Sequence, residues 1–269
     1  MAIPHALSVP HMTAAALRAH VAAGGAPLRL PGLGWRVPWD ATLTGLRHAV
    51  GEHTAVDVEL APRGRGYTDP RWERVTMGFG LFLDAFVLRS IPAADPAALP
   101  AGYLAQAPLL DLPGLREALP PLEHYRGPRG DVYGRTLWVG PRGSFTPFHR
   151  DPNVGLYSQI VGSKVFHLLP PHVEMARSAV RANTATVPVS VRRILEGAEV
   201  SGESEGEGEG EELEPQERIR FRALLEEAFT HDGACEVRLG PGDSVLIPPG
   251  WWHSAEGESI GVGVNAWFR

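Results

Sequence analysis

The chain has 269 residues, of which 43% are hydrophobic, with a formal net charge of −6 and a single cysteine. This length and apolar content allow a sizeable core within one large domain. One cysteine excludes a disulfide framework, a cysteine-based zinc site and an iron–sulfur cluster, and the net negative charge argues against a nucleic-acid binder that depends on overall positive charge.

The first 130 residues are expected to form an α/β region that does not fold as a separate domain. Apolar residues at helical spacing predict helices here, and alternation predicts strands, as where Val56, Val58 and Leu60 share one face. The elements expected are helices at 13–23, 43–50 and 79–91 and strands at 27–30 and 54–60.

From residue 131 onward the chain changes to short β-prone runs separated by glycine and proline. The runs 156–161 and 164–169 flank Gly162-Ser163, a connection that predicts a β-hairpin. The strands expected are 132–139, 156–161, 164–169, 235–239, 244–248 and 259–268, with one helix at about 217–229.

An acidic Gly/Glu/Ser segment interrupts this second part at about 200–214. It contains too few apolar residues to bury a core, so we expect a disordered insertion. Seven acidic residues lie between Glu203 and Glu214, and without them the formal charge of the chain would be +1. The net charge therefore carries no information about the substrate.

Targeting and membrane segments are not evident in the sequence. No stretch approaches ~18 uninterrupted apolar residues, and the N-terminus lacks a basic segment followed by an apolar run. We therefore expect an intracellular protein, cytoplasmic and/or nuclear, that does not contact a membrane.

Two segments about a hundred residues apart carry candidate metal ligands. His149-Arg150-Asp151 lies on a proline-flanked segment, and Pro248-Pro249-Gly250 precedes His253. In a barrel of antiparallel strands these three side chains can meet inside. Two neutral imidazoles and one carboxylate on one face leave coordination positions open, which suits the non-haem Fe(II) oxygenases. A structural zinc site would be closed and usually rich in cysteine.

Lys164 is a second, independent candidate. It begins an apolar strand in phase with Phe166 and Leu168, where a charge that faces the core is costly unless it is paired. The carboxylate of a cosubstrate would be such a partner, and Thr146 could add a hydroxyl hydrogen bond. Alternatively, Lys164 points into water beside the turn.

The last strand places two kinds of residue on its two faces. Ile260, Val262, Val264 and Ala266 share one face, and Gly261, Gly263, Asn265 and Trp267 share the other. Glycines on one face of a strand mark either the close approach of a ligand or tight packing at a barrel corner, and both interpretations remain open.

These residues together resemble the JmjC-domain branch of the 2-oxoglutarate- and Fe(II)-dependent oxygenases, in particular the JmjC domain-containing protein 5 group. The resemblance extends from Pro27-Leu28-Arg29-Leu30 to Trp267-Phe268. The segments that carry it are Arg65 to Asp69, Gly102 to Gln106, Trp138, Thr146 to Pro152, Gly162-Ser163-Lys164 and Asn265 to Phe268.

The resemblance implies a mainly β fold, a double-stranded β-helix of the jelly-roll or cupin type at 131–269 with an α/β extension at 1–130, together a single JmjC domain over 1–269. It also implies cofactors: Fe(II), 2-oxoglutarate as cosubstrate, and O₂. The group can have an asparagine six residues after its first histidine ligand, where this chain has Gly155, and Asn265 would compensate. The implied roles are His149, Asp151 and His253 as Fe(II) ligands, Lys164, Thr146, Tyr103 and Asn265 for 2-oxoglutarate, and Trp138, Gln106, Glu59, Tyr67 and Trp267 for the substrate pocket.

The implied activity is hydroxylation of a protein side chain, with arginine or another basic residue suggested by Glu59 and Asp69. A histone lysine demethylase is an alternative, although many of these carry a Cys/His zinc element that one cysteine cannot build. Hydroxylation of a tRNA base is a further alternative, but the sequence shows no basic patch with interleaved aromatic residues that would bind RNA. A metal-binding cupin without redox activity is the last alternative, and such a protein would not need Lys164 and Thr146. We expect a protein or peptide substrate, and no nucleic acid.

Overall fold

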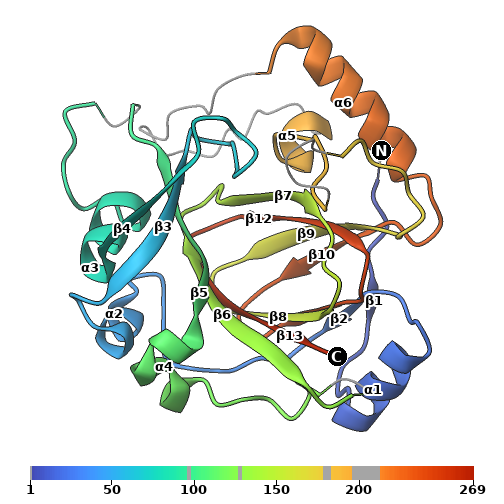
Figure 1. Cartoon of the computed structure of the whole chain (residues 1–269), viewed down its shortest axis with the longest axis horizontal. Coiled ribbons are helices and arrows are strands. Elements are labelled where there is room, and N and C mark those ends of the chain that lie inside the picture. Colours follow the sequence, from blue (N-terminus) through green and yellow to red (C-terminus); the bar gives the residue numbers. More distant parts are fainter. Residues whose placement is uncertain (1, 96–97, 127–128, 178–182, 196–212) are drawn as a thin grey trace.

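Two mainly antiparallel β-sheets face each other in the computed structural model and enclose the interior of a barrel (Figure 1). The structure describes residues 2–95, 98–126, 129–177, 183–195 and 213–269. The larger sheet has the order β1 (Leu7–Ser8), β2 (Leu28–Leu30), β11 (Ser244–Ile247), β8 (Val154–Val161), β13 (Gly261–Phe268), β6 (Val132–Gly140), β5 (Ala101–Pro108), β3 (Ala55–Ala61) and β4 (Glu73–Gly78). The smaller sheet has the order β10 (Cys235–Leu239), β9 (Lys164–Leu169), β12 (Trp252–Gly257) and β7 (Phe145–His149).

In its second half the chain crosses between the two sheets at every connection except the one from β9 to β10. Strands β6, β8, β11 and β13 belong to the larger sheet, and β7, β9, β10 and β12 belong to the smaller one. Consecutive strands from β6 to β13 therefore lie in opposite sheets, except for β9 and β10, which pair with each other within the smaller sheet; this is the jelly-roll arrangement. The predicted fold class, a double-stranded β-helix with an α/β N-terminal extension, is confirmed.

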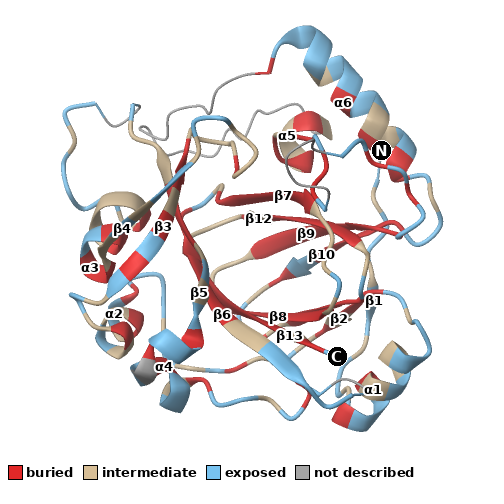
Figure 2. Ribbon diagram, in the orientation of Figure 1, coloured by how far each residue is buried: buried red, intermediate tan, exposed pale blue. Residues whose placement is uncertain are grey.

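Helices cover the outer faces of both sheets (Figure 1). Apolar residues of α1 to α4 pack behind the larger sheet, while α5 and α6 pack on the smaller one, and the buried positions concentrate where these layers meet (Figure 2). None of the helices among the described residues is both long and apolar enough to cross a membrane. The helices are α1 (Ala14–Ala22), α2 (Thr44–Val50), α3 (Phe79–Phe82), α4 (Pro113–Ala118), α5 (Val191–Leu195) and α6 (Pro215–Ala228), with a π-helical turn at Leu83–Val87 and a 3₁₀ turn at Leu109–Asp111.

Local patterns account for most of these elements. Thr13 caps α1, because its side-chain oxygen accepts a hydrogen bond from the amide of Ala16. Helix α2 ends at Gly51, which has a positive φ of 93°. The alternation in β3 also holds, since Val56, Val58 and Leu60 are buried.

The hairpin predicted at Gly162-Ser163 is wrong. Strand β8 pairs with β11 and β13, whereas β9 pairs with β10 and β12, so the connection is a corner between the sheets. Gly162 has a φ of 71°, and a Cβ there would clash with the carbonyl oxygen of Ile260. Both strands are buried along their whole length, and a two-residue connection alone does not say which neighbours they pair with.

Three other expectations need adjustment. The helix expected at 79–91 comprises α3 and the π-helical turn, and it ends at Val87. Strand β12, which carries His253, was not anticipated as a strand. The acidic insertion expected at about 200–214 lies, through residue 212, outside the described residues, and Leu213 is buried. The assignment of 1–269 to a single domain stays a prediction.

Candidate active site

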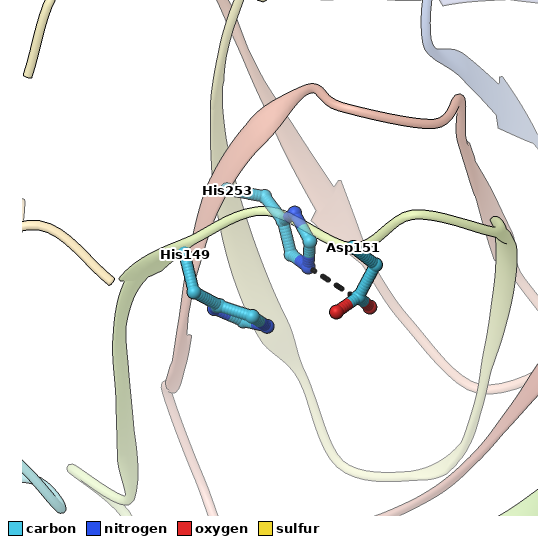
Figure 3. Close-up of side chains that lie close together, drawn as sticks. All are labelled: His149, Asp151 and His253. Atoms are coloured by element: carbon cyan, nitrogen blue, oxygen red, sulfur yellow. Dashed lines mark ion pairs between the residues drawn. The ribbon is translucent and has the colours of Figure 1, made fainter. Parts of the chain in front are cut away.

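Three candidate metal ligands lie close together on the smaller sheet, on two neighbouring strands and in the turn that follows one of them. His149 ends β7, Asp151 lies two residues later, and His253 on β12 is the register partner of His149. The imidazole centroids are 4.1 Å apart, and Nε2 of His253 lies 3.9 Å from Oδ2 of Asp151. One ligand atom from each residue falls within 4.8 Å of the others, and the side chains point toward one another (Figure 3). The structure thus brings together the three residues that the sequence singled out.

Both imidazoles are oriented by the backbone of their own segments. Nδ1 of His149 lies 2.9 Å from the carbonyl oxygen of Pro147, and Nδ1 of His253 lies 3.1 Å from that of Trp251. A carbonyl oxygen only accepts, so each Nδ1 carries the proton and donates it. In the neutral form of each ring, Nε2 is then the nitrogen whose lone pair is free for a metal.

Burial keeps His253 in the neutral form that metal binding requires. Desolvation lowers the pKa of His253 to about 4, helped by the nearby His149 and opposed in part by the Asp151 carboxylate. The imidazole is therefore unprotonated at neutral pH. A metal ion would not have to displace a proton from it.

Asp151, in the turn after β7, is held by contacts from other segments of the chain. The indole Nε1–H of Trp267, on β13, donates a 2.7 Å hydrogen bond to Oδ2 of Asp151. The amide of Gly250 donates to the carbonyl oxygen of Asp151 at 2.8 Å, which ties the turn after β7 to the turn before β12. Between the ligands, the Arg150 guanidinium points outward and stacks over Trp252 at 4.8 Å.

One pocket extends from these ligands into the barrel, between the two sheets. It contains the metal-ligand candidates, all four residues predicted to bind the cosubstrate, and two aromatic residues predicted for the substrate pocket. Its lining residues are Tyr103, Trp138, Thr146, His149, Asp151, Tyr157, Lys164, Phe166, Ile247, His253, Ala255, Asn265 and Trp267.

Lys164 is the only lysine of the chain, because the other 24 basic residues are arginines. Its side chain faces the barrel interior, so the alternative in which it points into water does not hold. Nζ donates to the Tyr103 hydroxyl at 2.8 Å and lies over the rings of Tyr103 and Tyr157. Burial lowers the pKa of Lys164 to about 7. Among the described residues no carboxylate pairs with this amine, so the site favours an anionic ligand.

Asn265 is the second polar group of the pocket without a full set of partners. It is buried, and within the described chain its Oδ1 accepts no hydrogen bond. A Cβ at Gly155 would lie 3.7 Å from this oxygen, at ordinary contact distance. Asn265 therefore faces the position at which the resembling group can have its asparagine.

The remaining candidates for the substrate pocket lie elsewhere. Gln106 is exposed at the irregularity in β5 and has a φ of 59°. Glu59 forms an ion pair with Arg74 at 3.0 Å, and the Tyr67 hydroxyl lies 3.4 Å from that of Thr184. These three candidates are not among the residues that line the pocket, whereas Trp138 and Trp267 are. Their role in substrate binding stays a prediction.

Sequence reasoning missed four pocket residues: Tyr157, Phe166, Ile247 and Ala255. Two of them carried a signal, because Phe166 follows Lys164 by two positions and Ala255 follows His253 by two, which places each pair on one face.

The contact with Tyr157 explains the glycine at position 263, since a Cβ there would clash with the Tyr157 hydroxyl. At Gly263 tight packing is the correct interpretation.

The sequence of the chain is similar to those of known proteins. Residues 47–269 match the model of a family described as Cupin-like domain. The chain is 24% identical over 222 residues to Lysine-specific demethylase JMJ30 of Arabidopsis thaliana, covering 82% of this chain and 44% of that protein. It is 24% identical over 241 residues to Lysine-specific demethylase 8 of Danio rerio, covering 87% of this chain and 48% of that protein.

A third relative carries the name of the group inferred from the sequence. Jumonji C domain-containing protein 5 of Drosophila melanogaster is 27% identical over 175 residues, covering 62% of this chain and 36% of that protein. The chain spans less than half the length of each of these three relatives. The resemblance to JmjC proteins is thereby confirmed.

Proposed function

The chain belongs to the cupin-like domain family, and we propose that it is an Fe(II)- and 2-oxoglutarate-dependent dioxygenase of the JmjC type that hydroxylates a side chain of a protein. One observation carries the proposal. A two-histidine, one-carboxylate cluster shares a pocket with the only lysine of the chain, which is buried without an acidic partner among the described residues. A metal ion and an anionic cosubstrate are the ligands that this combination fits.

The donor set fits Fe(II). Two imidazole nitrogens and one carboxylate oxygen form a set that leaves open positions, in contrast to a closed structural site. When bound, iron together with 2-oxoglutarate and O₂ supplies the oxidation, in which one oxygen atom enters the substrate and the other enters succinate with release of CO₂. The protein would contribute the Nε2 atoms of His149 and His253, and the carboxylate of Asp151 held by Trp267.

Lys164 would bind the carboxylate of 2-oxoglutarate that lies away from the metal. Its amine would exchange a costly buried charge for a charge-assisted hydrogen bond, and the bound carboxylate would keep the proton on Nζ. The Tyr103 hydroxyl, already 2.8 Å from that amine, and Thr146 would add hydrogen bonds. Asn265 would offer its amide to the other end of the cosubstrate.

The pocket walls would exclude water around these groups. Tyr157, Phe166, Ile247 and Trp138 are buried, and they present apolar surface to the cavity. The Trp138 indole donates to Thr136 at 3.0 Å, so its polar atom is satisfied and the ring is held in place. A dry pocket strengthens the contact between Lys164 and a carboxylate.

A basic residue is the substrate that we favour. Glu59 holds the guanidinium of Arg74, and Asp69 holds that of Arg71, so both acidic groups bind guanidinium groups of the chain itself. An arginine side chain of a substrate would compete with these internal partners. The second candidate is lysine demethylation, which is favoured by the names of two relatives and would hydroxylate a methyl group that then leaves as formaldehyde.

Succinate formation tests the oxygenase. We expect succinate from 2-oxoglutarate with Fe(II), O₂ and ascorbate, and we expect none with His149→Ala. His48→Ala, a matched change on the exposed side of α2, should retain the activity. Mass spectrometry of candidate peptides then separates a gain of one oxygen atom from the loss of a methyl group. Full activity of His149→Ala would refute the proposed site.

A further inference from the structure

We propose that Trp267 is a positioning residue that sets the metal affinity of the site by holding the Asp151 carboxylate. The inference rests on the proposed metal site and assigns the tryptophan a role beyond lining the pocket. It follows from one contact, the 2.7 Å hydrogen bond from the indole Nε1–H to Oδ2 of Asp151.

Asp151 needs such a contact more than the two histidines do. His149 and His253 are each anchored by a carbonyl oxygen two residues earlier in the chain, so their ring orientation is fixed locally. Asp151 lies beyond the end of β7, and the only side chain among the described residues that donates a hydrogen bond to it is the Trp267 indole. Its carboxylate orientation therefore depends on a residue distant in the sequence.

Trp267 is well placed to transmit rigidity to the carboxylate. It lies on β13, which pairs with β6 on one side and β8 on the other, in the larger sheet. Its register partners are Gly134 and Gly155, so the residues directly opposite leave room for the large ring. The hydrogen bond thus links the larger sheet to a ligand carried by the smaller sheet.

Removing the indole donor would release the carboxylate. Oδ2 already lies 3.9 Å from Nε2 of His253, and without the indole the group can rotate toward that ring or toward water. Loss of a hydrogen bond that orients a metal ligand typically weakens metal binding about 10- to 100-fold. We expect a change of that size in Trp267→Phe, which keeps an aromatic ring and removes the N–H.

Trp138 provides a matched control in the same pocket. Its indole donates to Thr136 rather than to a ligand, so Trp138→Phe removes an equivalent N–H without touching Asp151. Co²⁺ titration, followed by calorimetry and by visible d–d absorption, gives the affinity and reports the ligand geometry. Weaker Co²⁺ binding and an altered absorption band in Trp267→Phe, with both unchanged in Trp138→Phe, would support the role.

Two failures are distinguishable. If the wild type binds Co²⁺ no better than His149→Ala does, both the proposed metal site and this inference are refuted. If the wild type binds Co²⁺ and Trp267→Phe binds it equally well, only the positioning role of Trp267 is refuted.

If Trp267→Phe does not fold, the positioning role can be tested on the wild type through the NMR signals of the indole ¹H–¹⁵N groups. Zn²⁺ should then shift the Trp267 indole signal more than the Trp138 signal. Equal shifts, or none, would overturn the role.

Discussion

Replacing Lys164 with methionine removes one charge from the pocket and keeps a side chain of similar length. Burial lowers the pKa of Lys164 from 10.5 to about 7. Since a difference of one in pKa corresponds to about 1.36 kcal/mol, burying the protonated amine of Lys164 costs about 5 kcal/mol. Methionine avoids that cost but leaves the Tyr103 hydroxyl without the amine, a loss of about 1–2 kcal/mol. At pH 6 the ligand-free variant should therefore be about 3 kcal/mol more stable than the wild type.

The advantage should shrink as the pH rises. Below about pH 7 the lysine is protonated in both the folded and unfolded chain, so the full cost is present. Between about pH 7 and 10.5 the unfolded chain keeps the proton and the folded chain has released it, so the wild type gains stability with rising pH. From pH 6 to pH 9.5 the difference between the two proteins should fall by about 3 kcal/mol.

Cosubstrate binding should change in the opposite sense to stability. Breaking a buried charge pair typically costs about 3–5 kcal/mol, so 2-oxoglutarate should bind Lys164→Met about 10²- to 10⁴-fold more weakly. Calorimetry with Mn²⁺-loaded protein measures this affinity, urea unfolding at the two pH values measures stability, and Mn²⁺ affinity serves as the control because Lys164 is not a ligand candidate. Lys164→Arg, which keeps the charge, should recover part of the binding.

The single lysine permits a direct check. In protein with ¹⁵Nζ-labelled lysine, the one side-chain amine signal should titrate near pH 7, and 2-oxoglutarate should move its midpoint upward. Equal cosubstrate affinity in Lys164→Met and the wild type would refute the assignment. A stability difference independent of pH would refute the account of its burial.

Three further changes have defined outcomes. Gly155→Asn places its Cβ 3.7 Å from Oδ1 of Asn265, so the variant should fold normally and bind 2-oxoglutarate at least as tightly as the wild type; weaker binding in calorimetry would contradict the cosubstrate position. Gly263→Ala would clash with the Tyr157 hydroxyl, and overpacking should cost about 1–3 kcal/mol in urea unfolding, whereas an unchanged midpoint would show that the ring has room to move. Arg150→Ala removes the guanidinium stacked on Trp252 and should lower stability by about 1 kcal/mol, mostly recovered in Arg150→Lys; equal loss in both variants would mean that the charge over the ring contributes little.

Several features of the site follow from residue types and spacing. The two ligand segments could be recognised because His149 and Asp151 lie two positions apart on a proline-flanked segment and a proline–glycine turn precedes His253. Lys164 could be recognised because a charge in phase with buried apolar residues demands a partner. These signals are local, so no tertiary information is needed to find them.

Other candidates show the limit of local signals. Gln106 and Glu59 were selected by resemblance alone, and the structure places the first on the surface and pairs the second with Arg74. Periodicity also could not say that β8 and β9 belong to opposite sheets, because a two-residue glycine-containing connection serves a hairpin and a sheet corner equally well.

By itself, then, the sequence determined the mainly β class, most strand positions and the identity of the ligand and lysine candidates, since these depend on period and residue chemistry. Only the tertiary structure decided that His253 faces His149, that the Lys164 amine meets Tyr103 and that the Trp267 indole holds Asp151. Each of these contacts joins residues that are 61 or more positions apart, at a register fixed by the packing of two sheets against each other. Such a register depends on the packing of the whole core, so it cannot be predicted from any short segment of the chain.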